Sequence, residues 1–297
     1  MESLDRLALA DGTHLRLRTW PAPARPHGRV LIVHGLGEHG GRYAHVAQAL
    51  AHAGWASIGY DQRGHGDSDG VRGGIQQHDS LCADLAAVID HLRSDEGPFG
   101  GPFVLLGHSM GGLVAARFVA EALAASPAAW SRPVDALVLS SPALDTGLSA
   151  AQRAQLWLGE HLLPDRPMPN GLKPDWVSRD PQTVRDYVAD PQVHDRITAR
   201  LARFIVSEGE TVRDAAPRWR VPTLLMWAGA DRCVAPAGSA AFAAAAPKPL
   251  VQARCFEGLA HEIFNEPERA EVLGQLTQWL AGISGPTLPG TRPAAPA

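Results

Sequence analysis

The chain alternates between two patterns of hydrophobic positions. Short, nearly unbroken apolar runs predict strands buried on both faces, since such strands have no polar side. Longer stretches with apolar residues at three- and four-residue steps predict helices with one buried face. The runs are residues 30–33, 55–60, 103–106, 134–139, 223–227 and 252–256, and the helical stretches are residues 43–52, 79–93, 111–125 and 268–280, with an alanine-rich helix between the last two strands. This alternation predicts an α/β fold with a mostly parallel, doubly wound sheet.

Two regions depart from the alternation. Near the N-terminus, residues flanking Asp11 and Gly12 carry the signal of an antiparallel hairpin at one sheet edge. Residues 145–213 contain no clean strand and are too long for a bare loop. We therefore predict a core formed by residues 1–144 and 214–284, with a helical cap inserted at 145–213. The tail at 285–297, rich in proline, glycine and alanine, is expected to be disordered.

Composition excludes several classes of partner. The 297 residues are 45% hydrophobic and 20% charged, and the net charge of −4 argues against nucleic-acid binding. No apolar run is long enough to predict a transmembrane segment, and the first residues do not resemble a signal peptide. Cys82, Cys233 and Cys255 are far apart and odd in number, which favours reduced thiols. We expect a cytoplasmic protein; its oligomeric state stays open.

The sequence Gly107-His108-Ser109-Met110-Gly111 lies between a predicted strand and a predicted helix. In this context G-x-S-x-G indicates a nucleophile elbow, a strained turn that exposes the serine above the sheet. The glycines leave room for close backbone packing. We predict that Ser109 is a nucleophile and that the Met110 N–H stabilises an oxyanion at the helix N-terminus.

A serine hydroxyl needs a base and an orienting acid, because it is a weak nucleophile at its own pKa. His261 follows the last predicted strand and is the preferred base, with His194 in the insertion as the alternative. Asp231 follows the preceding strand and is the preferred acid, with Asp145 as the alternative. The order serine, acid, histidine is the one that suits this architecture.

A second oxyanion donor is expected from the loop after an early strand, where the Leu36 N–H is the candidate. The glycine-rich segment around Leu36 lacks the spacing of a phosphate-binding loop. His34 and His39 do not have the spacing of a zinc motif, and His261 lacks a second histidine four residues later. We therefore expect no metal and no cofactor.

Three motifs together resemble the monoacylglycerol lipase and lysophospholipase branch of the α/β-hydrolases. They are HGLGEHGGRY at 34–43, DQRGHGDS at 61–68 and GHSMGG at 107–112, and the similarity runs from about residue 7 to residue 281. The resemblance implies an α/β-hydrolase fold with a cap and a Ser109, Asp231 and His261 triad. It also associates Glu38 and Arg42 with the glycerol end of the substrate; the alternative is that they form a structural ion pair.

These observations predict a serine hydrolase that cleaves carboxylic esters through an acyl-enzyme, with monoacylglycerol or lysophospholipid-type lipids as preferred substrates. A broad carboxylesterase, a thioesterase or an acyltransferase would use the same triad, and a receptor could retain the pocket. Five apolar cap residues are candidate lining of an acyl groove, although a core role is an equal alternative: Leu156, Trp157, Leu158, Leu162 and Leu163. Transient contact of the cap with a membrane surface is a further hypothesis.

Overall fold

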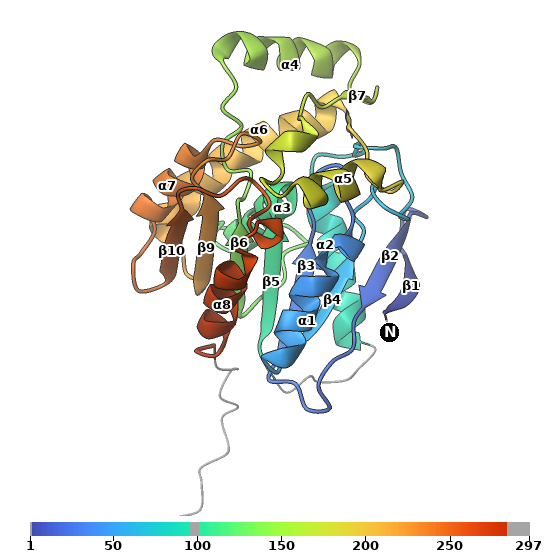
Figure 1. Cartoon of the computed structure of the whole chain (residues 1–297). Helices are drawn as coiled ribbons and strands as arrows, with labels where there is room; N and C mark the ends of the chain where they lie inside the picture. The colour runs from blue at the N-terminus through green and yellow to red at the C-terminus, as the bar shows by residue number, and fades with distance from the viewer. Residues whose placement is uncertain (1, 95–100, 284–297) are drawn as a thin grey trace, which may run out of the picture.

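The computed structural model describes residues 2–94 and 101–283. Its centre is an eight-stranded sheet in the order β1-β2-β4-β3-β5-β6-β9-β10 (Figure 1). The strands are β1 (Ser3–Ala8), β2 (His14–Thr19), β3 (Arg29–Val33), β4 (Ala56–Tyr60), β5 (Phe103–His108), β6 (Ala136–Ser140), β9 (Thr223–Ala228) and β10 (Val251–Phe256). From β4 to β10 neighbouring strands pair in parallel, whereas β1 and β2 form an antiparallel hairpin and β2 joins β4 antiparallel. The predicted fold class is confirmed.

Helices cover both faces of the sheet, which explains why its central strands are continuous apolar runs. They are α1 (Ala44–His52), α2 (Ser80–Ser94), α3 (Ser109–Glu121), α7 (Pro236–Ala245) and α8 (Arg269–Leu280). One buried cluster joins the sheet to α2, α3 and α7, with Leu85, Leu113 and Phe242 fully buried. A second cluster lies under α1 and α8 and includes Leu50 and Leu276.

Two predicted boundaries are wrong for physical reasons. The sequence pattern predicts the first strand of the hairpin at residues 6–10, but it runs from Ser3 to Ala8, because pairing with β2 continues to Thr19 although β1 is largely exposed and shows no apolar run. The helix predicted to reach residue 125 ends at Glu121. Its carboxylate accepts a hydrogen bond from the Ala128 N–H at 2.7 Å, which holds the chain as it leaves the helix axis.

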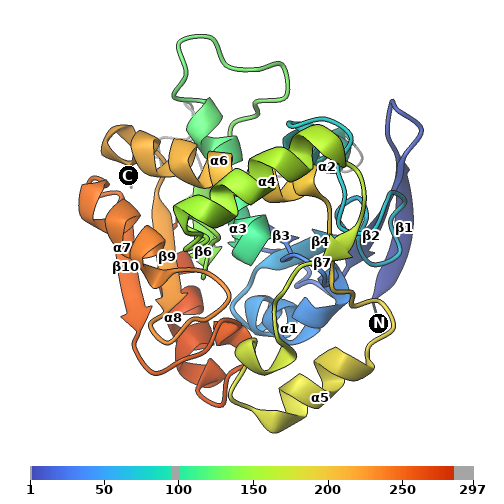
Figure 2. The ribbon, with the colours of Figure 1, turned by 90° about the horizontal axis from the view of Figure 1, so that it is seen from above.

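Between β6 and β9 the chain forms a mostly helical insertion. It contains α4 (Ala150–Leu162), α5 (Pro181–Ala189) and α6 (Ala199–Ala215), with a short pair of strands, β7 (Met168–Pro169) and β8 (Arg196–Ile197), that the sequence pattern did not indicate. Figures 1 and 2 show α4 on the outside of the molecule, above α6. Helix α6 packs on α3 through buried residues such as Phe204 and Val212. The cap boundaries at 145 and 213 stay a prediction, since α6 also belongs to the core cluster.

None of the helices in the described part of the chain combines the length and apolar character needed to cross a membrane. The predicted tail at 285–297 lies outside the described residues.

Candidate active site

Ser109 occupies a sharp turn between β5 and α3. Its φ of 53° is in the left-handed region, which is unusual for a residue with a side chain and indicates a strained turn. A Cβ on Gly107 would lie 2.4 Å from the Gly111 carbonyl oxygen, and a Cβ on Gly111 would lie 2.2 Å from that of Val33. The close packing that the motif predicts is therefore present, and it requires both glycines.

A hydrogen-bonded relay connects the three residues of the predicted triad. His261 Nε2 lies 2.8 Å from Ser109 Oγ, and His261 Nδ1 lies 2.6 Å from Asp231 Oδ2. Because the carboxylate only accepts, Nδ1–H donates to Asp231 and Nε2 is left to accept from the serine hydroxyl. The other carboxylate oxygen of Asp231 accepts the N–H groups of Cys233 and Val234, which fixes the acid in its loop.

The alternative base, His194, and the alternative acid, Asp145, form hydrogen bonds with groups outside the relay. His194 Nε2 is 3.1 Å from the Gly64 carbonyl oxygen, where it ties the insertion to the core. Asp145 accepts a hydrogen bond from the Gly147 N–H at 2.8 Å. Neither side chain joins the Asp231, His261 and Ser109 relay.

The electrostatic environment shifts the pKa values of the two histidines near Ser109 in opposite directions. Burial acts to lower the pKa of His261, but the charge and hydrogen bond of Asp231, with help from Glu262 and Glu38, raise it above its ordinary value. Burial and the nearby His261 lower the pKa of His108 to about 4. The rings are 4.8 Å apart between centroids. His108 is therefore a neutral wall of the site, whereas His261 is poised to accept a proton.

The loop after β3 lies directly against Ser109. A Cβ on Gly35 would be 3.1 Å from the Ser109 Cβ. Leu36 and Met110, whose N–H groups are the predicted oxyanion donors, line the same cavity as Ser109. The two residues that carry the candidate donors therefore lie beside Ser109.

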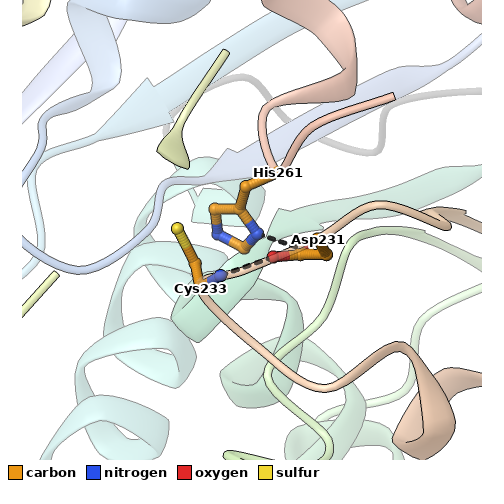
Figure 3. A group of neighbouring side chains, drawn as sticks. All are labelled: Asp231, Cys233 and His261. Carbon is orange, nitrogen blue, oxygen red and sulfur yellow. Dashed lines mark hydrogen bonds and ion pairs between the residues drawn. The ribbon is translucent and has the colours of Figure 1, made fainter. Parts of the chain in front are cut away.

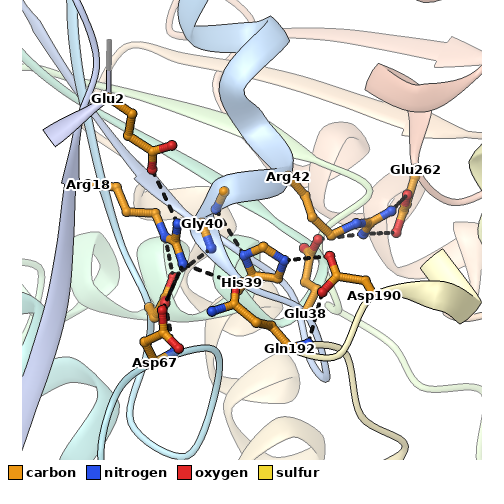
Figure 4. A network of polar contacts seen from close by, with 12 residues as sticks. Glu2, Arg18, Glu38, His39, Gly40, Arg42, Asp67, Asp190, Gln192 and Glu262 are labelled. Carbon is orange, nitrogen blue, oxygen red and sulfur yellow. Dashed lines mark hydrogen bonds and ion pairs between the residues drawn. The ribbon is translucent and has the colours of Figure 1, made fainter. Parts of the chain in front are cut away.

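Glu38 and Arg42 belong to a buried charge network (Figure 4). Glu38 Oε1 accepts from the Gly35 N–H at 2.6 Å and from the Tyr43 hydroxyl at 2.7 Å, and Oε2 accepts from Arg42 at 2.6 Å. Burial acts to raise the pKa of Glu38, but Arg42 and neighbouring groups lower it to about 2. Arg42 also binds both oxygens of Glu262, at 2.6 and 2.7 Å. Glu262 was not among the predicted site residues; its only sequence signal is its position next to His261.

Two cavities meet at Ser109. One, of about 320 Å³, has a mixed lining in which Glu38, His194 and Glu262 are among the polar residues; the other, of about 270 Å³, is mainly apolar and is lined by residues of α4 and α6. Both reach Ser109, so a substrate can place one end in each. Among the five candidate lining residues of the cap, only Leu156 lines the apolar cavity. The expectation is wrong for the other four, which are exposed: Trp157, Leu158 and Leu162 on α4, and Leu163 directly after it.

One group of potential metal ligands occurs in the described residues, formed by Asp231, Cys233 and His261 (Figure 3). Their ligand atoms lie within 4.8 Å of one another. Both ring nitrogens of His261 are engaged, with Asp231 and with Ser109, and burial raises the pKa of the Cys233 thiol far above its ordinary value. This donor set fits a proton relay better than a cation site, because a cation needs the thiolate and a free imidazole nitrogen.

A serine on such an elbow, with a histidine and an aspartate from later loops of a parallel sheet, defines a serine hydrolase of the α/β-hydrolase fold. The chain belongs to the family described as serine aminopeptidase, S33, whose model matches residues 24–268. It is 34% identical over 272 residues to the monoacylglycerol lipase of Mycolicibacterium smegmatis, covering 91% of this chain and 93% of the relative.

Two further comparisons agree with that assignment. The chain is 30% identical over 259 residues to a phospholipase of Bacillus subtilis, covering 86% of this chain and 95% of the relative. The crystal structure of the Paleococcus ferrophilus monoacylglycerol lipase matches with a TM-score of 0.77 at 30% identity, covering 94% of this chain and 98% of that one. The resemblance inferred from the three sequence motifs is confirmed.

Proposed function

We propose that this protein hydrolyses carboxylic esters of lipids, with Ser109 as nucleophile, His261 as base and Asp231 as the orienting acid. The observation that carries the proposal is the hydrogen-bonded relay of these three side chains where two cavities meet. The names of the relatives, a monoacylglycerol lipase and a phospholipase, support a lipid ester as the substrate.

The proposed reaction forms and then breaks a covalent acyl-enzyme. His261 Nε2 takes the Ser109 proton as Oγ attacks the ester carbonyl, and the N–H groups of Leu36 and Met110 stabilise the oxyanion. The protonated imidazole gives its proton to the departing alcohol as the C–O bond breaks. A water molecule then repeats the attack with the same base and releases the carboxylic acid. Every step uses side chains and amides of this chain, and none calls for a cofactor.

The two cavities suggest how the substrate lies. The apolar cavity beside α4 and α6 suits an acyl chain, and the cavity of mixed lining, with Glu38 and Glu262 in its wall, suits a small alcohol head group. A role for Glu38 and Arg42 at the glycerol end stays a prediction. Their contacts favour the alternative of a structural pair, because each already has buried partners within 2.7 Å.

We also propose that residues 145–213 act as a cap whose helix α4 contacts a lipid surface. None of the residues of α4 is buried, and Trp157 and Leu162 are 56% and 66% exposed. Leu156, on the same helix, lines the apolar cavity. A helix that touches both the bilayer and the cavity would give a lipid a short route to Ser109. A cytoplasmic location stays a prediction.

A substrate panel tests the proposed function. It compares monoacylglycerols of medium and long chain with lysophosphatidylcholine, triacylglycerol, an acyl thioester and an aminoacyl p-nitroanilide, each with wild type and Ser109→Ala. We expect the highest kcat/KM for single-chain esters, because the cavity beside Ser109 suits one chain. A preference for the anilide or the thioester would contradict lipid ester hydrolysis. Tight lipid binding without turnover by either form would instead indicate a receptor.

A further inference from the structure

Arg42 lies between two buried carboxylates that come from distant parts of the chain (Figure 4). Glu38 follows β3, and Glu262 follows β10, 220 residues after Arg42. The guanidinium binds Glu38 through one nitrogen and Glu262 through two, all at 2.6 to 2.7 Å. The side chains of Glu38 and Glu262 are 4% and 6% exposed, so this pairing is shielded from water and salt.

Each carboxylate is tied to a loop that carries part of the proposed machinery. Glu38 accepts the N–H of Gly35, the residue before the proposed oxyanion donor Leu36. Glu262 directly follows His261, and its own N–H donates to the Val177 carbonyl oxygen in the insertion at 2.8 Å. The guanidinium therefore links the oxyanion loop to the base loop. A planar fork with donors in fixed directions suits such a link.

The same three residues also set the charge around the base. Two carboxylates share one guanidinium, so the group as a whole contributes a negative charge next to His261. Glu262 and Glu38 are, after Asp231, the groups that raise the pKa of His261. Negative charge there stabilises the imidazolium that forms as Ser109 attacks.

We infer that Glu262 is a positioning residue for this active site: with Arg42 and Glu38 it fixes the His261 loop against the oxyanion loop and supplies charge that stabilises protonated His261. The inference rests on the proposed function for its effect on turnover. Its effect on the ionisation of His261 holds whatever the substrate is.

The first test is the pH dependence of kcat/KM for Glu262→Gln, which keeps the size of the side chain and removes its charge. The groups that face His261 are Asp231, Glu38, Glu262, His108, Cys233 and Ser109. Only the charge of Glu262 changes, so the pKa of His261 falls and its neutral form persists to lower pH. We expect the acidic limb to move down by about half a pH unit and kcat to fall about tenfold with little change in KM.

A purely structural pair would give a different result. It would lower the melting temperature and the active fraction and leave the acidic limb in place, which would overturn the inference. Glu271→Gln is the matched control, because it removes a carboxylate that pairs with Arg254 on the exposed surface. We expect the wild-type pH profile for this variant.

Two further variants separate position from charge and keep the inference testable if Glu262→Gln does not fold. Glu262→Asp keeps the charge but is too short for the two-point contact, and Arg42→Lys keeps the charge but has no fork. Both should lower kcat about tenfold and leave the acidic limb where it is in wild type. Unchanged kcat in both variants would overturn the positioning role.

Titration of the His261 imidazole by NMR makes the result independent of turnover. We expect a lower pKa in Glu262→Gln than in wild type and no change in Glu271→Gln. Equal His261 pKa values in all three proteins would overturn the inference even if the enzyme is an active esterase. A shifted pKa in a protein with no esterase activity would support the inference and contradict the proposed function.

Discussion

The loops at the carboxyl ends of the sheet strands and the outer face of the insertion differ sharply in how their side chains are held. In those loops, Ser109, His261 and Asp231 are each fixed by hydrogen bonds to other groups of the site. On α4, by contrast, none of the residues is buried and large apolar side chains face solvent. This contrast supports the division of roles that we propose: the core holds the triad, and the insertion controls which substrate reaches it.

The strongest prediction concerns the core. Ser109→Ala removes the nucleophile, so kcat should fall by about 10⁴-fold or more, because only the oxyanion donors and binding remain. The left-handed turn is kept, and circular dichroism should show an unchanged fold. Hydrolysis above about a tenth of the wild-type rate would show that the elbow serine is not the nucleophile.

The next prediction compares two aspartates after neighbouring strands. Asp231→Asn should lower kcat by roughly 10³ to 10⁴, since the amide favours the wrong tautomer of His261. Asp145→Asn should leave kcat unchanged, because the Asp145 side chain accepts a hydrogen bond from the nearby Gly147 N–H and takes no part in the relay. Steady-state rates with a soluble ester decide between them. The reverse ranking would place the acid after β6.

Substitution of Arg42 tests whether the network of Glu38, Arg42 and Glu262 supports the structure of the site or binds the substrate. Arg42→Ala leaves Glu38 and Glu262 unpaired, so kcat/KM should fall roughly ten- to a hundredfold for a monoacylglycerol and for an acyl-matched p-nitrophenyl ester alike. The ratio between the two substrates is the measurement. A loss confined to the glycerol ester would show that Arg42 binds the head group.

The smallest effect on hydrolysis is expected from substitutions in the insertion. Trp157→Ser combined with Leu162→Ser should raise KM about three- to tenfold for substrate presented in lipid vesicles. It should leave the hydrolysis of a short soluble ester unchanged, since neither side chain lines the cavities. Leu4→Ser on β1, 47% exposed and away from α4, is the control. Equal effects on both substrates would show that α4 acts through the cavity rather than through a lipid surface.

The same division explains what the sequence could predict. The elbow is a local feature, because strand, turn and helix follow one another and the glycines mark the close packing around Ser109. Asp231 and His261 could be chosen because loops after parallel strands meet at one edge of the sheet. The order of motifs therefore located three residues that the fold brings within hydrogen-bonding distance.

Two features could not be predicted from the sequence, because they depend on contacts between distant parts of the chain or on what covers a helix face. Glu262 was missed because it joins the site through Arg42, which lies 220 residues earlier in the chain. A glutamate next to a histidine belongs to no motif that would indicate this contact. The apolar residues of α4 were expected to line an acyl groove or to lie in the core, yet Trp157 and Leu162 are exposed. Hydrophobic spacing identifies an apolar helix face but not the surface that it contacts.

We propose above that the relay through His261 to Asp231 activates Ser109. The most direct measurement is labelling of the purified protein with a fluorophosphonate, followed by mass spectrometry of the modified peptide. We expect modification of Ser109 in wild type, none in Ser109→Ala, and greatly slowed modification in His261→Gln. Equal labelling rates in wild type and His261→Gln, or modification of a different residue, would contradict it.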